Sequence, residues 1–217
     1  MLGLEVKHMV NLKNTWIELL SLFNYPCIPK DMLDSIKGPI ILHISDTPVD
    51  IYGYIYRIID ILKPQYIIHT GDMADNIKLE IYKNRIDSYF SGVKKLIERL
   101  EKNDFAKIYY ALGNHDDLET VSNLTKKGTI LDDGILTIGG YNLLVNHYYK
   151  EAPYSNIDFH LYGHSFEPGH FNENGTIGLN GLLNINIIDL SDKRVFHLEY
   201  PTSTNTSRGM KLKRIGL

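Results

Sequence analysis

Nearly continuous runs of apolar residues alternate with amphipathic stretches through the first 128 residues of the chain. The runs 39–44, 65–69 and 107–112 are typical of strands that are buried on both faces of a sheet. Between them, apolar positions at helical spacing predict one helix near 51–62 and a longer one near 82–100. Strand, helix and strand repeated in this order predict a βαβαβ core with parallel strands.

The residues before the first strand also follow a helical pattern. Four apolar side chains share one helical face, namely Trp16, Leu19, Leu20 and Phe23. A second short helix is predicted from about Pro29 to Ile36. We therefore expect residues 1–38 to form an N-terminal helical appendage that packs on a main domain of residues 39–200.

After about residue 128 the rhythm changes to short strand-like runs separated by Gly, Asn and Asp turns. The predicted runs are 129–131, 135–138, 142–146, 158–162, 176–179, 184–190 and 194–200. Such a series predicts an antiparallel sheet packed on the first half of the chain. Residues 201–217 are expected to form a polar C-terminal tail whose basic side chains are solvated.

Composition narrows the functional classes. The net charge of −3 argues against broad electrostatic attraction to nucleic acid or anionic membranes. A single cysteine, Cys27, excludes an intrachain disulfide and a thiolate zinc cluster. No apolar run is long enough to span a bilayer and no signal-peptide order is present, so we expect a cytoplasmic protein.

Polar side chains with metal-binding potential stand directly after the predicted strands. They are Asp46, Asp72, Asp75, Asn114, His115, Asp116, His147 and His164. Ligands bind at the carboxyl ends of strands in open α/β sheets, so these residues should gather at one edge. Carboxylate, carboxamide and imidazole together suit a divalent ion such as Mn²⁺, Fe²⁺ or Zn²⁺.

The order of these residues resembles the motif series of calcineurin-like metallophosphoesterases. The matching motifs are Asp46, Gly71-Asp72-Met73-Ala74-Asp75, Gly113-Asn114-His115-Asp116, His147 and Gly163-His164. Single motifs of this kind are weak, but the complete ordered set on strand ends is a strong signal. The resemblance implies a four-layer αββα sandwich of two mixed sheets. It also implies hydrolysis of a phosphate monoester or diester by a metal-activated water.

Family resemblance also assigns metal ligands. Asp46 would bind the first metal, and Asp72 would be the carboxylate that bridges the two ions. Asn114, His147 and His164 would complete the shell of the second metal. Two ions about 3.5–4 Å apart can clamp the attacking and leaving oxygens of a phosphoryl displacement.

Three further residues receive roles from the same resemblance. His115 would lie beside the phosphate, stabilise charge and protonate the leaving oxygen. Asp116 would hold the imidazole in its orientation. Asp75 would support the metal ligands without binding the ion itself.

The chain departs from the family pattern at two positions. The usual Asp-x-His motif ends in Pro48, and the usual Gly-His-x-His motif ends in Phe166. Both missing histidines would bind the first metal, so we expect two ions, or a mononuclear enzyme if the first metal binds weakly or not at all. A substitute ligand (Asp50, Glu167 or His170) is one alternative. A catalytically degenerate fold that acts as a metal-stabilised binding or scaffold module is another.

The remaining histidines have simpler interpretations. His43 and His69 lie within buried strands and are expected to be hydrogen-bonded core residues. His160 and His197 have no supporting context and are expected to be structural or exposed. The sequence does not identify the substrate, and the absence of a basic groove counts against nucleic acid.

Overall fold

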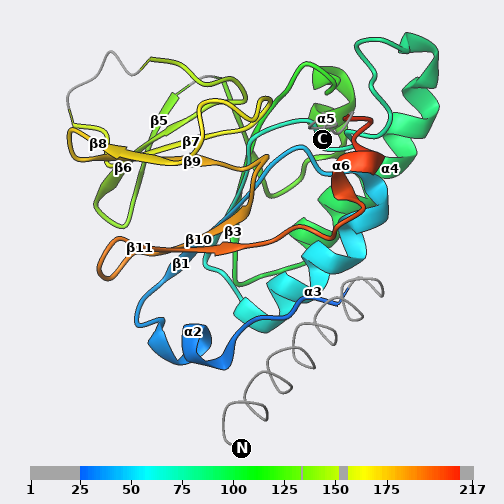
Figure 1. Cartoon of the computed structure of the whole chain (residues 1–217). Coiled ribbons are helices and arrows are strands. Elements are labelled where there is room, and N and C mark those ends of the chain that lie inside the picture. The colour runs from blue at the N-terminus through cyan, green and yellow to red at the C-terminus, as the bar shows by residue number, and fades with distance from the viewer. Residues whose placement is uncertain (1–24, 133, 152–155, 211–217) are drawn as a thin grey trace, which may run out of the picture.

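The computed structural model describes residues 25–132, 134–151 and 156–210, and these residues form two facing β-sheets with helices beside the larger one (Figure 1). The helix predicted around Trp16 to Phe23 lies outside the described residues. The second short helix is confirmed as α2, Lys30–Ser35.

The larger sheet contains the predicted parallel strands at its centre. Its order is β11-β10-β1-β2-β3-β4, and β1 to β4 run parallel to one another. The strands are β1 (Ile40–Ile44), β2 (Tyr66–His69), β3 (Lys107–Ala111), β4 (Thr129–Leu131), β10 (Ile185–Asp189) and β11 (Arg194–Leu198). The βαβαβ prediction is therefore confirmed.

The crossover segments between these strands are helical, as their periodicity predicts. A 3₁₀ turn, η1 (Val49–Ile51), leads into α3 (Tyr52–Leu62) between β1 and β2. The long helix begins as a second 3₁₀ turn, η2 (Lys83–Arg85), and continues as α4 (Ile86–Glu101). A shorter helix, α5 (Leu118–Leu124), connects β3 to β4.

The smaller sheet is mixed, so the prediction of an antiparallel sheet for the second half is wrong. Its order is β5-β6-β7-β9-β8, in which β6–β7 and β7–β9 are parallel pairs. Its strands are β5 (Gly134–Ile138), β6 (Tyr141–Val145), β7 (Phe159–Tyr162), β8 (Phe171–Glu173) and β9 (Thr176–Asn180). Strands β4, β10 and β11 join the larger sheet instead. The sequence could not predict this, because an apolar run indicates that a strand is buried but not which strand it pairs with.

Successive residues of β1 belong to two different cores. Leu42 packs with the helices of the larger sheet, while Ile41 packs with residues such as Phe159 between the sheets. Consecutive side chains of a strand face opposite ways, so this central strand must be apolar at every position. The sandwich of two mixed sheets is confirmed. All described helices precede β4 or follow β11, so within these residues the smaller sheet has no helix between its own strands.

The C-terminal segment packs on the domain, at least as far as it is described. Residues 204–207 form a short helix, α6 (Thr204–Ser207), and Thr204 and Arg208 are buried. The expectation of solvated basic side chains is therefore wrong for Arg208. None of the helices in the described part of the chain has the length and apolar character needed to cross a membrane.

Candidate metal centre

Loops at the carboxyl ends of the strands bring the predicted site residues together. The backbone N–H of Asp46 donates to the carbonyl of Gly71 at 2.9 Å, which joins the loop after β1 to the loop after β2. Asp46, Asp72 and His164 have positive φ angles of 50°, 56° and 67°. Non-glycine residues adopt this region rarely and at a cost, and such strain concentrates at functional sites.

Gly71 shows why the loops after β2 and β3 can approach so closely. Its φ is +97°, and a Cβ there would lie 2.5 Å from the nitrogen of Gly113 and 2.6 Å from Nδ1 of His147. A larger residue would force these segments apart. The glycine of the Gly-Asp motif is therefore a packing requirement of the site.

Four side-chain atoms converge on one point at this edge. Nε2 of His147 lies 3.1 Å from Oδ1 of Asn114 and 3.2 Å from Nδ1 of His164. It also lies 3.4 Å from Oδ2 of Asp72. On its other side, Nδ1 of His147 faces the carbonyl of Thr70 at 2.7 Å, so in the neutral ring Nδ1 carries the hydrogen and Nε2 a lone pair. Carboxylate, carboxamide and imidazole atoms gathered at one point are ligands that a divalent metal ion accepts, so the donor set fits such an ion.

Charge at this cluster is reflected in two pKa values. Burial alone would lower the pKa of His147, but hydrogen bonding and charge from Asp72, with the charge of Asp46, raise it to about 9. Burial raises the pKa of Asp72. The hydrogen bond to His147 and the charge of that ring act against burial and bring the pKa of Asp72 below its usual value. Asp72 therefore favours a proton on His147, and a metal ion held by this donor set would have to replace that proton.

His115 lies beside this cluster and not within it. Its backbone N–H donates to Oδ1 of Asp72 at 2.8 Å, which fixes the loop after β3 against the loop after β2. Ligand atoms of His115, Asp72 and Asp75 lie within 4.8 Å of one another. Nδ1 of His115 is also 3.8 Å from Oε2 of Glu80, and that oxygen accepts a 2.6 Å hydrogen bond from Nδ2 of Asn114.

Asp75 is a buried carboxylate with one satisfied oxygen. Its Oδ1 pairs with Nζ of Lys78 at 2.5 Å, while its buried Oδ2 has no hydrogen-bond partner among the described residues. Burial raises the pKa of Asp75 to about 7, although the bond to Lys78 acts against this. Asp75, like Asp72 and Glu80, is therefore a carboxylate close to His115.

Asp116 has a different position from the one the resemblance implies. Its Oδ2 accepts the N–H groups of Asp72 and Gly113 at 2.7 and 2.9 Å. Its Oδ1 accepts the N–H of Met73 and the hydroxyl of Tyr89, both at 2.8 Å. Within the described residues no hydrogen bond joins Asp116 to the His115 ring, so its contacts support bracing of the two loops instead of orientation of the imidazole.

Replacing Asp116 by Asn is expected to lower the free energy of unfolding by about 3 kcal/mol. The amide can accept at only one of its two ends, so two of the four donors lose their partner, at about 1–3 kcal/mol each. Urea unfolding followed by circular dichroism measures the change. Asp117→Asn is the matched control, because Asp117 caps α5 through Thr120 N at 2.8 Å and Asn caps equally well. Equal losses in both variants would contradict the bracing role.

The half of the site assigned to the first metal is poor in ligands. Asp46 is buried at its edge, where its Oδ2 accepts the hydroxyl of Ser45 at 2.6 Å and the N–H of His164 at 3.1 Å. Pro48 leads into η1 and Phe166 is exposed. The groups of acidic and histidine residues able to hold an ion are, among the described residues, Asp72 with His147 and His164, and Asp72 with Asp75 and His115.

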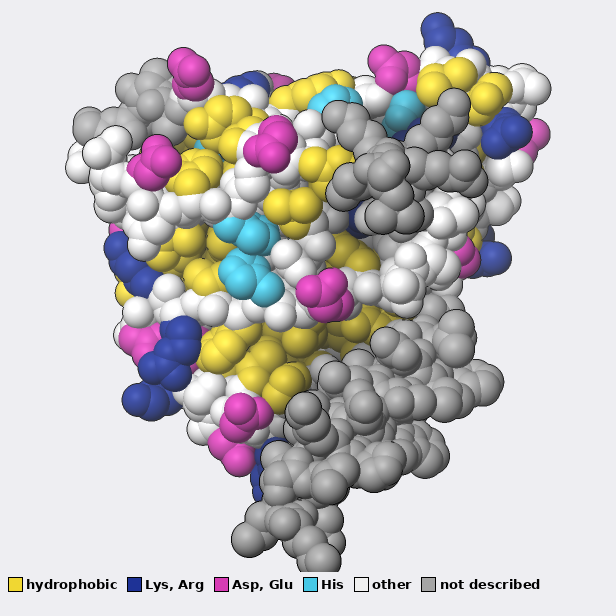
Figure 2. Space-filling view, viewed as in Figure 1, with side chains coloured by type: hydrophobic (Ala, Val, Ile, Leu, Met, Phe, Trp, Pro, Cys, Tyr) yellow, Lys and Arg dark blue, Asp and Glu magenta, His cyan; other side chains and the backbone are white. Residues whose placement is uncertain are grey.

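None of the three suggested substitute ligands belongs to these groups. Both nitrogens of His170 are engaged, Nε2 with Asn184 at 3.1 Å and Nδ1 with the N–H of Asn180 at 3.1 Å. Its ring stacks on His197 with centroids 4.3 Å apart. Figure 2 shows histidine side chains next to apolar ones on the face that it views. Asp50 accepts a hydrogen bond from Ser207, and Glu167 is exposed.

The interpretation of His43 and His69 as hydrogen-bonded core residues is confirmed. Nε2 of His43 lies 2.9 Å from Oγ1 of Thr70, and Nε2 of His69 lies 2.8 Å from Oγ1 of Thr47. Both rings are fully buried. Through Thr70 and Thr47 they contact the loops that carry Asp72 and Asp46.

Sequence reasoning missed four side chains at or under the site: Lys78, Glu80, Tyr89 and Arg208. Tyr89 lies on the apolar face of the helix predicted near 82–100, and hydrophobic periodicity does not indicate what its hydroxyl contacts. Lys78 and Glu80 lie in the turns between β2 and α4, where no pattern marks orientation. Arg208 stands in a polar stretch that is indistinguishable by composition from a solvated end.

Comparison with known families agrees with this geometry. The family model described as calcineurin-like phosphoesterase matches residues 40–200, which is most of the chain. The chain belongs to this family. Membership supports metal-dependent hydrolysis of phosphate esters in general, and the donor set described above provides candidate ligands for a divalent metal.

Of two similar chains among the solved structures, the first has the same fold. An archaeal phosphodiesterase is 18% identical with a TM-score of 0.53, over 74% of this chain and 99% of its own. The phosphoesterase Yfce from E. coli is 13% identical with a TM-score of 0.48, over 75% of this chain and 100% of its own. A comparison with curated proteins finds no significant match.

Proposed function

We propose that this chain hydrolyses a phosphate ester with a divalent ion held by Asp72, Asn114, His147 and His164. The observation that carries the proposal is the convergence of their lone-pair atoms within 3.1–3.4 Å of Nε2 of His147. A divalent ion held there supplies Lewis acidity and lowers the pKa of water. Mn²⁺, Fe²⁺ and Zn²⁺ suit this mixture of nitrogen and oxygen donors.

The chain's own residues then position the substrate. His115 is placed to protonate the leaving oxygen, because its ring lies next to the ion-binding cluster without belonging to the His147–His164 group. Burial lowers the pKa of His115, and the charges of Asp72 and Glu80 act against that shift and favour the charged ring. Lys78, held by Asp75 at 2.5 Å, offers a positive charge to a phosphate oxygen.

A mononuclear centre is the form of the site that we propose. The half with Asp72, Asn114, His147 and His164 has four donors, whereas the other half has Asp46 and a share of Asp72. Pro48 cannot coordinate and Phe166 is apolar. Anomalous scattering from crystals grown with Mn²⁺ should therefore reveal one well-occupied ion, and two would contradict this form.

The same two replacements favour a second candidate function, in which the fold is a metal-stabilised binding module. A phosphoesterase that loses two ligands of one ion retains its shape and a surface for a partner. Exposed aromatic side chains at the site, Tyr148 and Phe166, provide apolar area for such a contact. A chain that stays inert with every divalent ion would favour this candidate.

Hydrolysis of bis-p-nitrophenyl phosphate with added Mn²⁺ tests the enzymatic proposal. On diphenyl phosphate, whose more basic leaving oxygen needs a proton, His115→Ala is expected to lower the rate roughly 100-fold or more, because a general acid contributes about 10²–10⁴. His170→Ala is the matched histidine control, since His170 lies outside the cluster, and its rate should be unchanged. An equal loss in both variants, or no loss in His115→Ala, would contradict the role of His115.

A further inference from the structure

Arg208 is a charged side chain that the proposed reaction does not use, and it is the largest fully buried side chain described. Only 1% of it is exposed. A buried charge is costly unless its donors are satisfied and its charge is balanced. What surrounds the guanidinium therefore indicates why it is there.

Four neutral acceptors receive the guanidinium N–H groups. Nε donates to the carbonyl of Asp46 at 2.7 Å, and Nη2 donates to the carbonyl of Ser45 at 3.3 Å. Nη1 donates to the carbonyl of Leu182 at 2.9 Å and to Oδ1 of Asn205 at 3.0 Å. The ring of Tyr200 lies 4.5 Å from the guanidinium carbon. No ion pair to Arg208 is present in the described part of the chain, so its charge has no direct counterion.

Two of these acceptors belong to the turn that carries a predicted metal ligand. Asp46 has a φ of 50°, a conformation that needs support from its surroundings. The bond from Nε of Arg208 to the Asp46 carbonyl provides that support. The Asp46 carboxylate in turn accepts the N–H of His164, so the orientation of a second predicted ligand depends on the same turn.

The charge of Arg208 lies behind the part of the site that is poor in ligands. Asp46, Asp72 and Asp75 are buried carboxylates at this edge. Burial raises the pKa of Asp46, while the charges of His147 and Arg208 act against that shift. A fixed cation at this position offsets negative charge where Pro48 and Phe166 replace neutral ligands.

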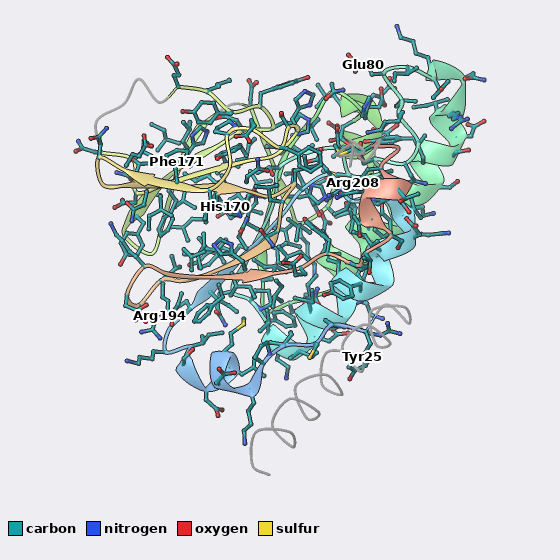
Figure 3. The ribbon with its side chains drawn as sticks, in the orientation of Figure 1. Tyr25, Glu80, His170, Phe171, Arg194 and Arg208 are labelled. Atoms are coloured by element: carbon teal, nitrogen blue, oxygen red, sulfur yellow. The ribbon has the colours of Figure 1, made fainter. Side chains whose placement is uncertain are left out.

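The segment that holds Arg208 follows the residues matched by the family model, which end at 200. It is attached to the domain by several contacts, among them the hydrogen bond from Ser207 to Asp50. Figure 3 shows Arg208 beside α6, and it shows Arg194 at the other end of the molecule, in β11. The support for Asp46 thus comes from a part of the chain that the family pattern does not include.

We propose that Arg208 is a positioning residue of the metal centre, which fixes the Ser45–Asp46 turn from the C-terminal segment and places a permanent positive charge behind Asp46. The inference deepens the proposed function, because it assigns this segment a part in building the ion-binding site. It predicts that a change at Arg208 alters metal affinity without removing any ligand.

Mn²⁺ titration of the full chain, followed by electron paramagnetic resonance, tests this proposal. Arg208→Ala is expected to bind Mn²⁺ about 10–100-fold more weakly, as is usual when a residue that supports metal ligands is lost. Millimolar guanidinium chloride should restore part of the affinity. Arg194→Ala, which removes a partly exposed arginine paired with Asp192, should bind as the unchanged protein does. A folded Arg208→Ala variant with unchanged affinity would overturn the proposal.

If the alanine variant fails to fold, Arg208→Lys is the second variant to test, because it keeps the positive charge. The ammonium group cannot reproduce the planar fork to four acceptors, so Mn²⁺ affinity should still fall about 10-fold. Hydrogen–deuterium exchange of the metal-free protein gives an independent result, because amides 45–47 should exchange faster in Arg208→Lys than in Arg194→Ala. Unchanged exchange at 45–47 would overturn the positioning role. If the protein without any substitution binds no Mn²⁺, the proposed function is rejected. The hydrogen–deuterium exchange result would still test the positioning role of Arg208.

Discussion

Asp72→Asn should reduce phosphoesterase activity at least about a thousandfold. Oδ2 of Asp72 lies 3.4 Å from Nε2 of His147, so the variant removes the negative charge from the centre of the donor set. Lewis-acid stabilisation by a metal contributes several kcal/mol, and each 1.36 kcal/mol corresponds to about tenfold in rate. The amide can still accept the N–H of His115, so the fold should persist.

The measurement is the rate of bis-p-nitrophenyl phosphate hydrolysis across a series of Mn²⁺ concentrations. Asp104→Asn is the matched control, because Asp104 is an exposed carboxylate that pairs with Lys127 and does not belong to the donor set. It should retain full activity. Activity of Asp72→Asn that returns to the normal value at high Mn²⁺ would mean that Asp72 serves affinity alone.

Acid should destabilise the protein steeply between about pH 6.5 and pH 3. Burial lowers the pKa of His43 and of His69 to about 3 in the folded chain, from an ordinary value of 6.5. Below pH 6.5 the unfolded chain takes up protons that the folded chain excludes, so stability present above pH 6.5 is lost as the pH falls toward 3. Each histidine contributes up to about 1.4 kcal/mol per pH unit.

Urea unfolding at pH 7, 6, 5 and 4 measures this slope. His43→Gln keeps a group that can hydrogen-bond to Thr70 but does not titrate, so it should reduce the slope by about 1.4 kcal/mol per pH unit. The variant is compared with the unchanged protein at every pH, because its stability at pH 7 differs as well. An unaltered slope would show that the acid sensitivity has another source.

Much of the site could be predicted because strand order determines it. Asp46, Asp72 and Asn114 each follow a strand of the parallel core, and parallel neighbours place their carboxyl ends at one edge. His147 and His164 follow β6 and β7, which turned out to be parallel neighbours in the smaller sheet. The structure brings these side chains together, although the pairing of the later strands was predicted wrongly.

The remaining features depend on tertiary contacts that the pattern of residues does not encode. The apolar run 184–190 was predicted to be a strand, but nothing in it indicates that β10 pairs with β1, whose residues lie 143 to 149 positions earlier. Asp116 was assigned by its neighbour in sequence, whereas its carboxylate contacts loops at Gly113 and Asp72. Arg208 was judged by the polarity of its segment, which a single buried guanidinium does not alter.

The pairing of β1 with β10 also constrains how the chain can fold. Ile40 pairs with Asp189, so one side of the first strand of the domain stays open until nearly the whole sequence is available. Contacts between such distant residues slow folding, because a long loop must close before they stabilise anything. On the ribosome, the parallel core could assemble early. The turn with Asp46 could be completed only after Arg208 has emerged, so metal binding should be among the last properties that a newly synthesised chain acquires.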